Sequence, residues 1–94
     1  MNYNEAIADY GYAIKLNKDY DEAFKNRGEC YQILDRFREA EKDYAKVVDM
    51  APQHIVVLFN LALCLEELGE KEKAQENLDE GIRVFESETD ADLK

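Results

Sequence analysis

The chain has 94 residues and a formal net charge of −10, with two cysteines and one histidine. Its acidic residues are concentrated toward the C-terminus. The net charge is −1 for residues 1–20, −2 for residues 21–54 and −7 for residues 55–94. A field of this sign repels phosphate backbones, which argues against nucleic acid as a partner. The longest apolar stretch, Ile55 to Leu65, is shorter than the ~20 residues that a membrane span needs, so no membrane role is expected.

Apolar residues recur at helical spacing along the whole chain, and no segment alternates as a half-buried strand does. We therefore expect five helices, joined by short links that make neighbouring helices run antiparallel. Gly69 suits the left-handed conformation that ends a helix, and Asp35, at the equivalent turn, tolerates it better than most residues. The expected helices are Tyr3 to Leu16, Asp21 to Leu34, Arg36 to Met50, His54 to Leu68 and Glu70 to Phe85.

Similar windows recur along the chain at a fixed step of 34 residues. Ala6, Ala40 and Ala74 occupy the same place in successive windows, and so do Cys30 and Cys64. A period of this length, made of paired helical patterns, is the signature of a helical solenoid. We therefore predict an all-α fold, a helical-repeat solenoid of antiparallel helix pairs.

The residues at these recurring positions resemble the tetratricopeptide repeat (TPR) family. Residues 21–54 match its pattern nearly throughout, and residues 55–86 match it with aliphatic side chains in place of aromatic ones. The resemblance implies a right-handed superhelix and a broad role in binding proteins. The matching residues are Phe24, Gly28, Tyr31, Phe37, Ala40, Tyr44 and Pro52, then Leu58, Leu61, Ala62, Leu65, Gly69, Ala74 and Leu78.

The resemblance divides the chain into the second half of a truncated repeat (residues 1–20), two complete repeats (21–54 and 55–86) and an acidic tail (87–94). The tail is nearly free of apolar residues, so we expect it to be frayed or disordered; a helix that starts at Ser87 or Thr89 is the alternative. The resemblance also implies a core. It comprises Phe24, Gly28, Tyr31, Ala40, Tyr44, Leu58, Leu61, Ala62, Leu65, Ala74 and Leu78.

Glycine and alanine occupy the middle of the first helix of each complete repeat. The resemblance implies that Gly28 and Ala62 let the paired helices approach closely, opposite Ala40 and Ala74. Gly81 is instead expected to face the place where another repeat would stack.

No group of residues in the sequence predicts an enzyme, a cofactor or a metal site. His54 stands beside a helix start, where an exposed cap-region residue is the expected role. Cys30 and Cys64 recur as small packing residues between stacked helices do, so both are expected to be reduced and structural. Reduced cysteines favour a cytoplasmic location.

The family has one known ligand site whose residues can be looked for in the sequence. This site is the carboxylate clamp, which binds the acidic C-terminal tails of heat-shock chaperones. In one register Lys25 and Asn60 fit, but Glu29 stands where the clamp needs Asn. In the other register Asn26 fits, but Val56 and Asn60 replace Lys and Arg. Both registers lack the donors for charge-assisted hydrogen bonds, so we expect no clamp.

The leading functional hypothesis is a non-enzymatic protein-interaction module with a concave groove lined by the first helix of each repeat. Successive residues of a helix are 100° apart around its axis. This spacing brings Val56, Phe59 and Leu63 together on one side of their helix, away from the core side. They predict an apolar anchor site, and the surrounding carboxylates favour a ligand with basic flanks. The expected groove residues are Val56, Phe59, Asn60, Leu63, Glu22, Lys25, Asn26 and Glu29, with further acid at Glu66 and Glu67.

The competing hypothesis is a structural segment of a larger TPR array. The ends of the stack are expected to expose Ile7, Tyr10 and Ile14 at one side and Leu78 and Ile82 at the other. Exposed apolar ends are a solubility liability for solenoids, so self-association into a homo-oligomer through these ends is the expected remedy.

Overall fold

The computed structural model describes the backbone of residues 2–93 and the side-chain surroundings of residues 2–89. Within this range the chain forms five helices and no strand, as the sequence predicts. The first four helices end within one residue of their expected bounds. They are α1 (Tyr3–Leu16), α2 (Asp21–Ile33), α3 (Phe37–Met50), α4 (Ile55–Glu67) and α5 (Lys71–Leu93).

Local signals set the ends of the helices. Asp35 and Gly69 both adopt positive φ, at 59° and 79°, and turn the chain after α2 and α4 as expected. His54 has the cap role that its position predicts, because its Nδ1 accepts a hydrogen bond of 3.4 Å from the backbone N–H of Val57 at the start of α4. The short turns that result make neighbouring helices antiparallel.

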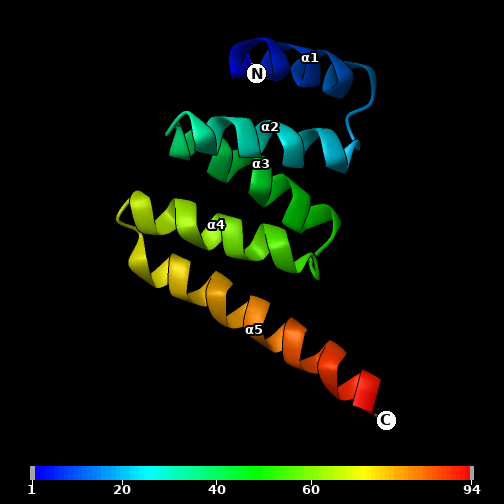
Figure 1. Ribbon diagram of the computed structural model, residues 1–94, viewed down its shortest axis with the longest axis vertical. Coiled ribbons are helices and arrows are strands. Elements are labelled where there is room, and N and C mark those ends of the chain that lie inside the picture. The colour runs from blue at the N-terminus through cyan, green and yellow to red at the C-terminus, as the bar shows by residue number, and fades with distance from the viewer. Residues whose placement is uncertain (1, 94) are drawn as a thin grey trace.

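The helices stack in chain order, with α1 at one end of the molecule and α5 at the other (Figure 1). Each helix packs mainly against its neighbours in the sequence, so the stack is elongated, with extents of 44 × 30 × 23 Å. The order α2–α3 and α4–α5 gives the two complete helix pairs, and α1 adds a single helix before them. A stack of this kind depends on the interfaces between successive helices.

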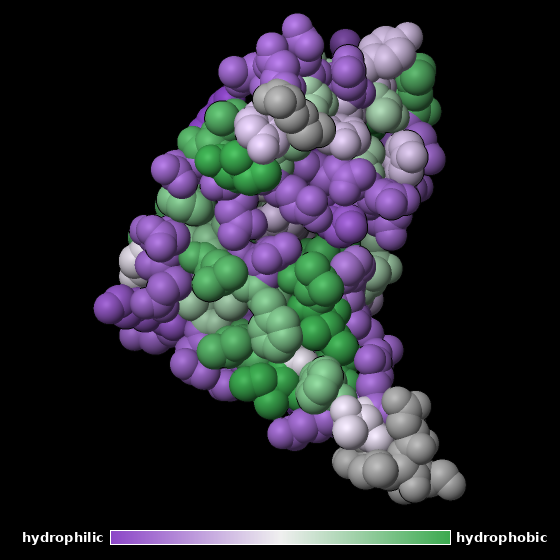
Figure 2. All heavy atoms as spheres, in the orientation of Figure 1, coloured by the Kyte–Doolittle hydropathy of each residue, from purple (hydrophilic) through white to green (hydrophobic). Residues whose placement is uncertain are grey.

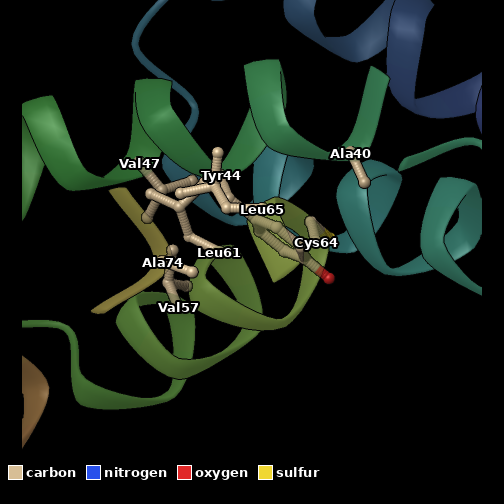
Figure 3. Close-up of a cluster of buried hydrophobic side chains, with 8 residues drawn as sticks. All are labelled: Ala40, Tyr44, Val47, Val57, Leu61, Cys64, Leu65 and Ala74. Atoms are coloured by element: carbon tan, nitrogen blue, oxygen red, sulfur yellow. The ribbon is translucent and has the colours of Figure 1, made fainter. Parts of the chain in front are cut away.

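The main core lies where α4 packs on α3 (Figure 3). Ala40, Tyr44 and Val47 of α3 are almost completely buried there, and α4 contributes four further residues. The Tyr44 hydroxyl donates a hydrogen bond of 2.7 Å to the side-chain oxygen of Gln32, so its polar end is satisfied. The residues of α4 in this cluster are Val57, Leu61, Cys64 and Leu65.

The expectation of a disordered tail is wrong for the described residues. The α5 helix continues without a break through residues 87–93. The segment after Phe85 contains no glycine or proline to stop it, and the Thr89 hydroxyl donates to the Phe85 carbonyl oxygen one turn earlier. Lys94 lies outside the described residues.

Two helical glycines lie directly under aromatic rings. A Cβ added to Gly28 would lie 2.8 Å from the Tyr44 ring, so this glycine makes room for Tyr44. A Cβ added to Gly81 would lie 2.8 Å from the ring of Phe59. Gly81 is therefore buried under α4, which corrects the expectation that it faces an unfilled stacking site.

Three expected core residues are less buried than predicted. Phe24 and Tyr31 are half-buried, and the guanidinium of Arg27 lies 5.7 and 5.9 Å from their ring centroids. Leu78 is exposed, since no described residue covers that side of α5. The eight other residues of the expected core are buried.

Arg27 also forms a paired hydrogen bond with Asp43 of α3, which is buried. Its Nε donates to one carboxylate oxygen at 2.8 Å and its Nη2 to the other at 2.7 Å. The hydrogen bond to Asp43 raises the pKa of the Arg27 guanidinium, so this side chain keeps its positive charge inside the interface. One repeat later the same two positions hold Leu61 and Asn77.

The surroundings of two helical glycines, Gly28 and Gly11, predict opposite effects of adding a methyl group. Gly28→Ala should lower the free energy of unfolding by about 1–2 kcal/mol, because overpacking against the buried Tyr44 ring outweighs the better helix propensity of alanine. Gly11→Ala should raise it by about 0.5–1 kcal/mol, since its new Cβ would meet Arg27 at an ordinary 3.6 Å. Urea denaturation followed by circular dichroism measures both; equal effects would contradict the packing described here.

The Arg27–Asp43 pair predicts a large cost when one partner is removed alone. Asp43→Ala should lower the free energy of unfolding by about 3 kcal/mol, because it leaves a partly buried guanidinium without its carboxylate. The double variant Arg27→Leu, Asp43→Asn copies Leu61 and Asn77 of the next repeat and should recover most of the loss. A double variant no more stable in urea than Asp43→Ala would show that the pair is not responsible.

Candidate partner-binding surface

The expected groove residues lie on two successive first helices, α2 and α4. Val56 and Leu63 are both 57% exposed on α4, which is high for aliphatic side chains on a helix that is otherwise mostly buried. Phe59 and Asn60, between them, are half-buried. On α2, Glu22 is exposed, and Lys25, Asn26 and Glu29 are half-buried.

Four of the eight expected groove residues line two separate hollows, and the other four, Val56, Asn60, Asn26 and Glu29, line neither of them. Glu22 and Lys25 line a small hollow of about 160 Å³ with Asp21, Val47 and His54. Phe59 and Leu63 line a larger hollow of about 320 Å³ between α4 and α5. The other residues of the larger hollow are Ala62, Glu66, Ala74, Gln75 and Leu78.

Phe59 has a structural role that the sequence did not reveal. Its ring fills the space above Gly81, where even a Cβ atom would be too close. It therefore joins α4 to α5 and also forms part of the wall of the larger hollow. Helical spacing alone places Phe59 with Val56 and Leu63. Its contact with Gly81 of α5 shows that the ring turns toward α5.

The charges around this surface are mainly negative. Lys25 is engaged by Glu29, with 3.8 Å between the ammonium nitrogen and a carboxylate oxygen. Glu22, Glu66 and Glu67 are exposed carboxylates. On the face shown in Figure 2, hydrophobic residues gather over the part of the molecule formed by α4 and α5. The surface thus combines exposed aliphatic groups with excess acid.

The TPR family model matches residues 19–87 of this chain, which include all of α2, α3 and α4. The chain belongs to the tetratricopeptide repeat family. This TPR chain also resembles segments of longer proteins. It is 30% identical over 81 residues to the rat mitochondrial import receptor subunit TOM70, which covers 81% of this chain and 13% of the receptor. It is 34% identical over 70 residues to mouse DnaJ homolog subfamily C member 7, which covers 72% of this chain and 14% of that protein.

Solved TPR structures have the same fold. The structure of MamA superposes with a TM-score of 0.89 at 23% identity, over 94% of this chain and 52% of MamA. The second TPR domain of Spaghetti (RPAP3), bound to the HSP90 peptide SRMEEVD, gives 0.83 at 20% identity, over 87% of this chain and 76% of that one. YrrB, described as a TPR protein with an unusual peptide-binding site, gives 0.79 at 27% identity, over 87% of this chain and 42% of YrrB.

The described residues contain neither a group of metal ligands nor a helix that could span a membrane. Among them, no three His, Cys, Asp or Glu side chains are grouped so as to hold a metal ion. In the same part of the TPR chain, no helix combines the length and the apolar character that crossing a membrane requires.

The two cysteines are free and buried. Burial raises the pKa of Cys64 to about 11, and it also raises the pKa of Cys30. Both are therefore thiols near neutral pH, and thiols are poor nucleophiles. The contribution of Cys64 to stability is present below its ordinary pKa of 9.0 and is lost as the pH rises toward 11, because the unfolded chain loses this proton first.

The raised pKa of Cys64 predicts slow alkylation of the folded protein. In a Cys30→Ala variant at pH 8, iodoacetamide should modify Cys64 about 100-fold more slowly than in the urea-unfolded chain, because a pKa near 11 leaves about one hundredth of the ordinary thiolate. Mass spectrometry of timed samples gives both rates. Equal rates in the folded and unfolded chains would contradict the burial of this thiol.

Proposed function

We propose that this TPR chain is a non-enzymatic interaction module that captures a peptide with an apolar anchor and basic flanks on the side of α4 that carries Val56 and Leu63. The observation that carries the proposal is the 57% exposure of these two aliphatic side chains, with Glu66 lining the same hollow as Leu63. The free cysteines support placing the module in a reducing, cytoplasmic compartment.

The apolar part of the surface supplies the anchor. Fully burying an aliphatic side chain is worth about 1.5–3 kcal/mol, and Val56 and Leu63 forgo a large part of that in the unbound chain. A ligand that covers them recovers it, and interface anchors of this kind carry much of the binding energy. The half-buried Asn60 between them offers a side-chain amide that can bond to a peptide backbone.

The charges select the ligand. Spaghetti binds the acidic peptide SRMEEVD. In this chain the positions at which a clamp would need amide and cationic groups hold Glu29 and Val56, and Lys25 is already paired with Glu29. With Glu22, Glu66 and Glu67 nearby, an acidic peptide meets like charge, whereas a basic one meets opposite charge.

A pair of matched peptides tests the proposal. We expect SRMKKVK, amidated at its C-terminus, to bind at least 10-fold more tightly than SRMEEVD, and the difference to shrink at high salt because exposed charges are screened. Fluorescence anisotropy of labelled peptides at two salt concentrations measures both affinities. Tighter binding of SRMEEVD would overturn the charge assignment.

Substitution of the exposed aliphatic residues tests the anchor. The double variant Val56→Ser, Leu63→Ser should weaken binding of SRMKKVK by about 2 kcal/mol while leaving the helical content unchanged, because both side chains are exposed. Tyr12→Ser removes a similarly exposed apolar residue from α1 and serves as the control. Phe59 is avoided because its ring also supports α5 through Gly81. If the control weakens binding as much as the double variant, the anchor lies elsewhere.

A further inference from the structure

A second unpartnered surface runs along the outer side of α5. Leu78, Ile82 and Phe85 are 37%, 42% and 57% exposed. Their spacing of four and three residues places them on one face of the helix, in line with Gln75. This stripe is distinct from the concave side of α4 that carries Val56.

The chain itself shows how such a stripe is normally covered. Tyr44 and Val48 of α3 hold the repeat positions that Leu78 and Ile82 hold in α5. Helix α4 packs on that face of α3, and the Tyr44 ring also lies over Gly28 of α2, so Tyr44 is completely buried and Val48 is packed against the core. The stripe on α5 is therefore the same kind of helix-accepting surface, without a helix on it among the described residues.

The stripe continues into the larger hollow between α4 and α5. Leu78 forms one wall of this hollow of about 320 Å³, and Phe59 and Leu63 of α4 are among its other walls. A helix laid along α5 would insert side chains into it, as ridges of one helix enter grooves of its neighbour.

Acidic side chains lie on both sides of the stripe and the hollow. Glu72, Asp79 and Glu86 follow one another at intervals of seven residues, which puts them in a row beside the stripe. Across the hollow, Glu66 of α4 adds a further carboxylate. Helix α5 carries three cations, of which Lys73 pairs with Glu70, Arg83 pairs with Glu80, and Lys71 lies at the N-terminal end of the stripe.

The charge distinguishes among candidate occupants. A second copy would bring another −7 from its own residues 55–94 against the same surface. Like charge opposes that contact, whereas cationic residues flanking an apolar stripe would pair with Glu72, Asp79 and Glu86 as e and g positions do in coiled coils. We propose that the outer face of α5, with the hollow beside α4, docks a basic amphipathic helix of a partner protein.

The direct test uses two designed helices about 20 residues long, a length at which helices form readily. Both carry the buried face of α4, with Val and Leu at the positions of Val57, Leu61 and Leu65; one has Lys and Arg on its remaining face and the other has Glu. Titration calorimetry with the 94-residue chain should show the basic helix binding at least 10-fold more tightly than the acidic one. Equal affinities, or binding of neither helix, would overturn the proposal.

Three variants that each add one negative charge locate the site. Ile82→Glu and Phe85→Glu should weaken binding of the basic helix at least 10-fold, because they place a carboxylate in the apolar seam. Val56→Glu, an equally exposed position on the concave side of α4, should leave it unchanged. If Val56→Glu alone weakens binding, the helix occupies the concave side and the α5 proposal fails.

Two further measurements separate this proposal from the alternatives. Phe85→Glu should retain the affinity of the parent chain for the heptapeptide SRMKKVK, so that failure of one surface is distinguishable from failure of the other. Light scattering should show the parent chain and Phe85→Glu with the same mass. A dimer of the parent chain that Phe85→Glu dissociates would make a second copy the occupant and overturn the assignment to a basic helix.

Discussion

The packing of α4 on α3 is the interaction on which the rest of the molecule depends. It joins the two complete repeats, and it places Tyr44 and Val47 against Val57, Leu61 and Cys64 in the most deeply buried part of the chain. Because each helix packs mainly on its sequence neighbours, no distant contact replaces this interface if it is lost. It also fixes which side of α4 faces away from the core, and therefore where a ligand can reach it.

The two repeats use the same positions for different chemistry. The first places Arg27 between two aromatic rings and pairs it with Asp43 inside the α2–α3 interface, whereas the second places Leu61 and Asn77 at those positions. A buried ion pair adds little net stability compared with an apolar pair, but it penalises any other helix register, which would leave one charge alone. The second repeat carries no charge at these two positions, and the apolar residues of both proposed surfaces lie on it.

The 34-residue period and local turn chemistry predicted the fold closely, because they act through residues near one another in the sequence. Asp35, Gly69 and His54 behave as their positions indicate. The errors concern contacts between helices: the Phe59 ring over Gly81 depends on how α5 crosses α4, which no local pattern encodes. Of the candidate site, the exposure of Val56 and Leu63 followed from helical spacing, but the split into two hollows did not.

Helix α4 connects the two proposed surfaces. It is apolar around most of its circumference, and a helix of that kind is normally enclosed on all sides. Helix α3 covers one side and α5 covers another, partly through Phe59. The third side, with Val56 and Leu63, remains open among the described residues, and Leu63 also reaches the hollow beside α5. The same excess of apolar residues that holds α4 between its neighbours thus creates both open surfaces, and the acid around them determines which partners they accept.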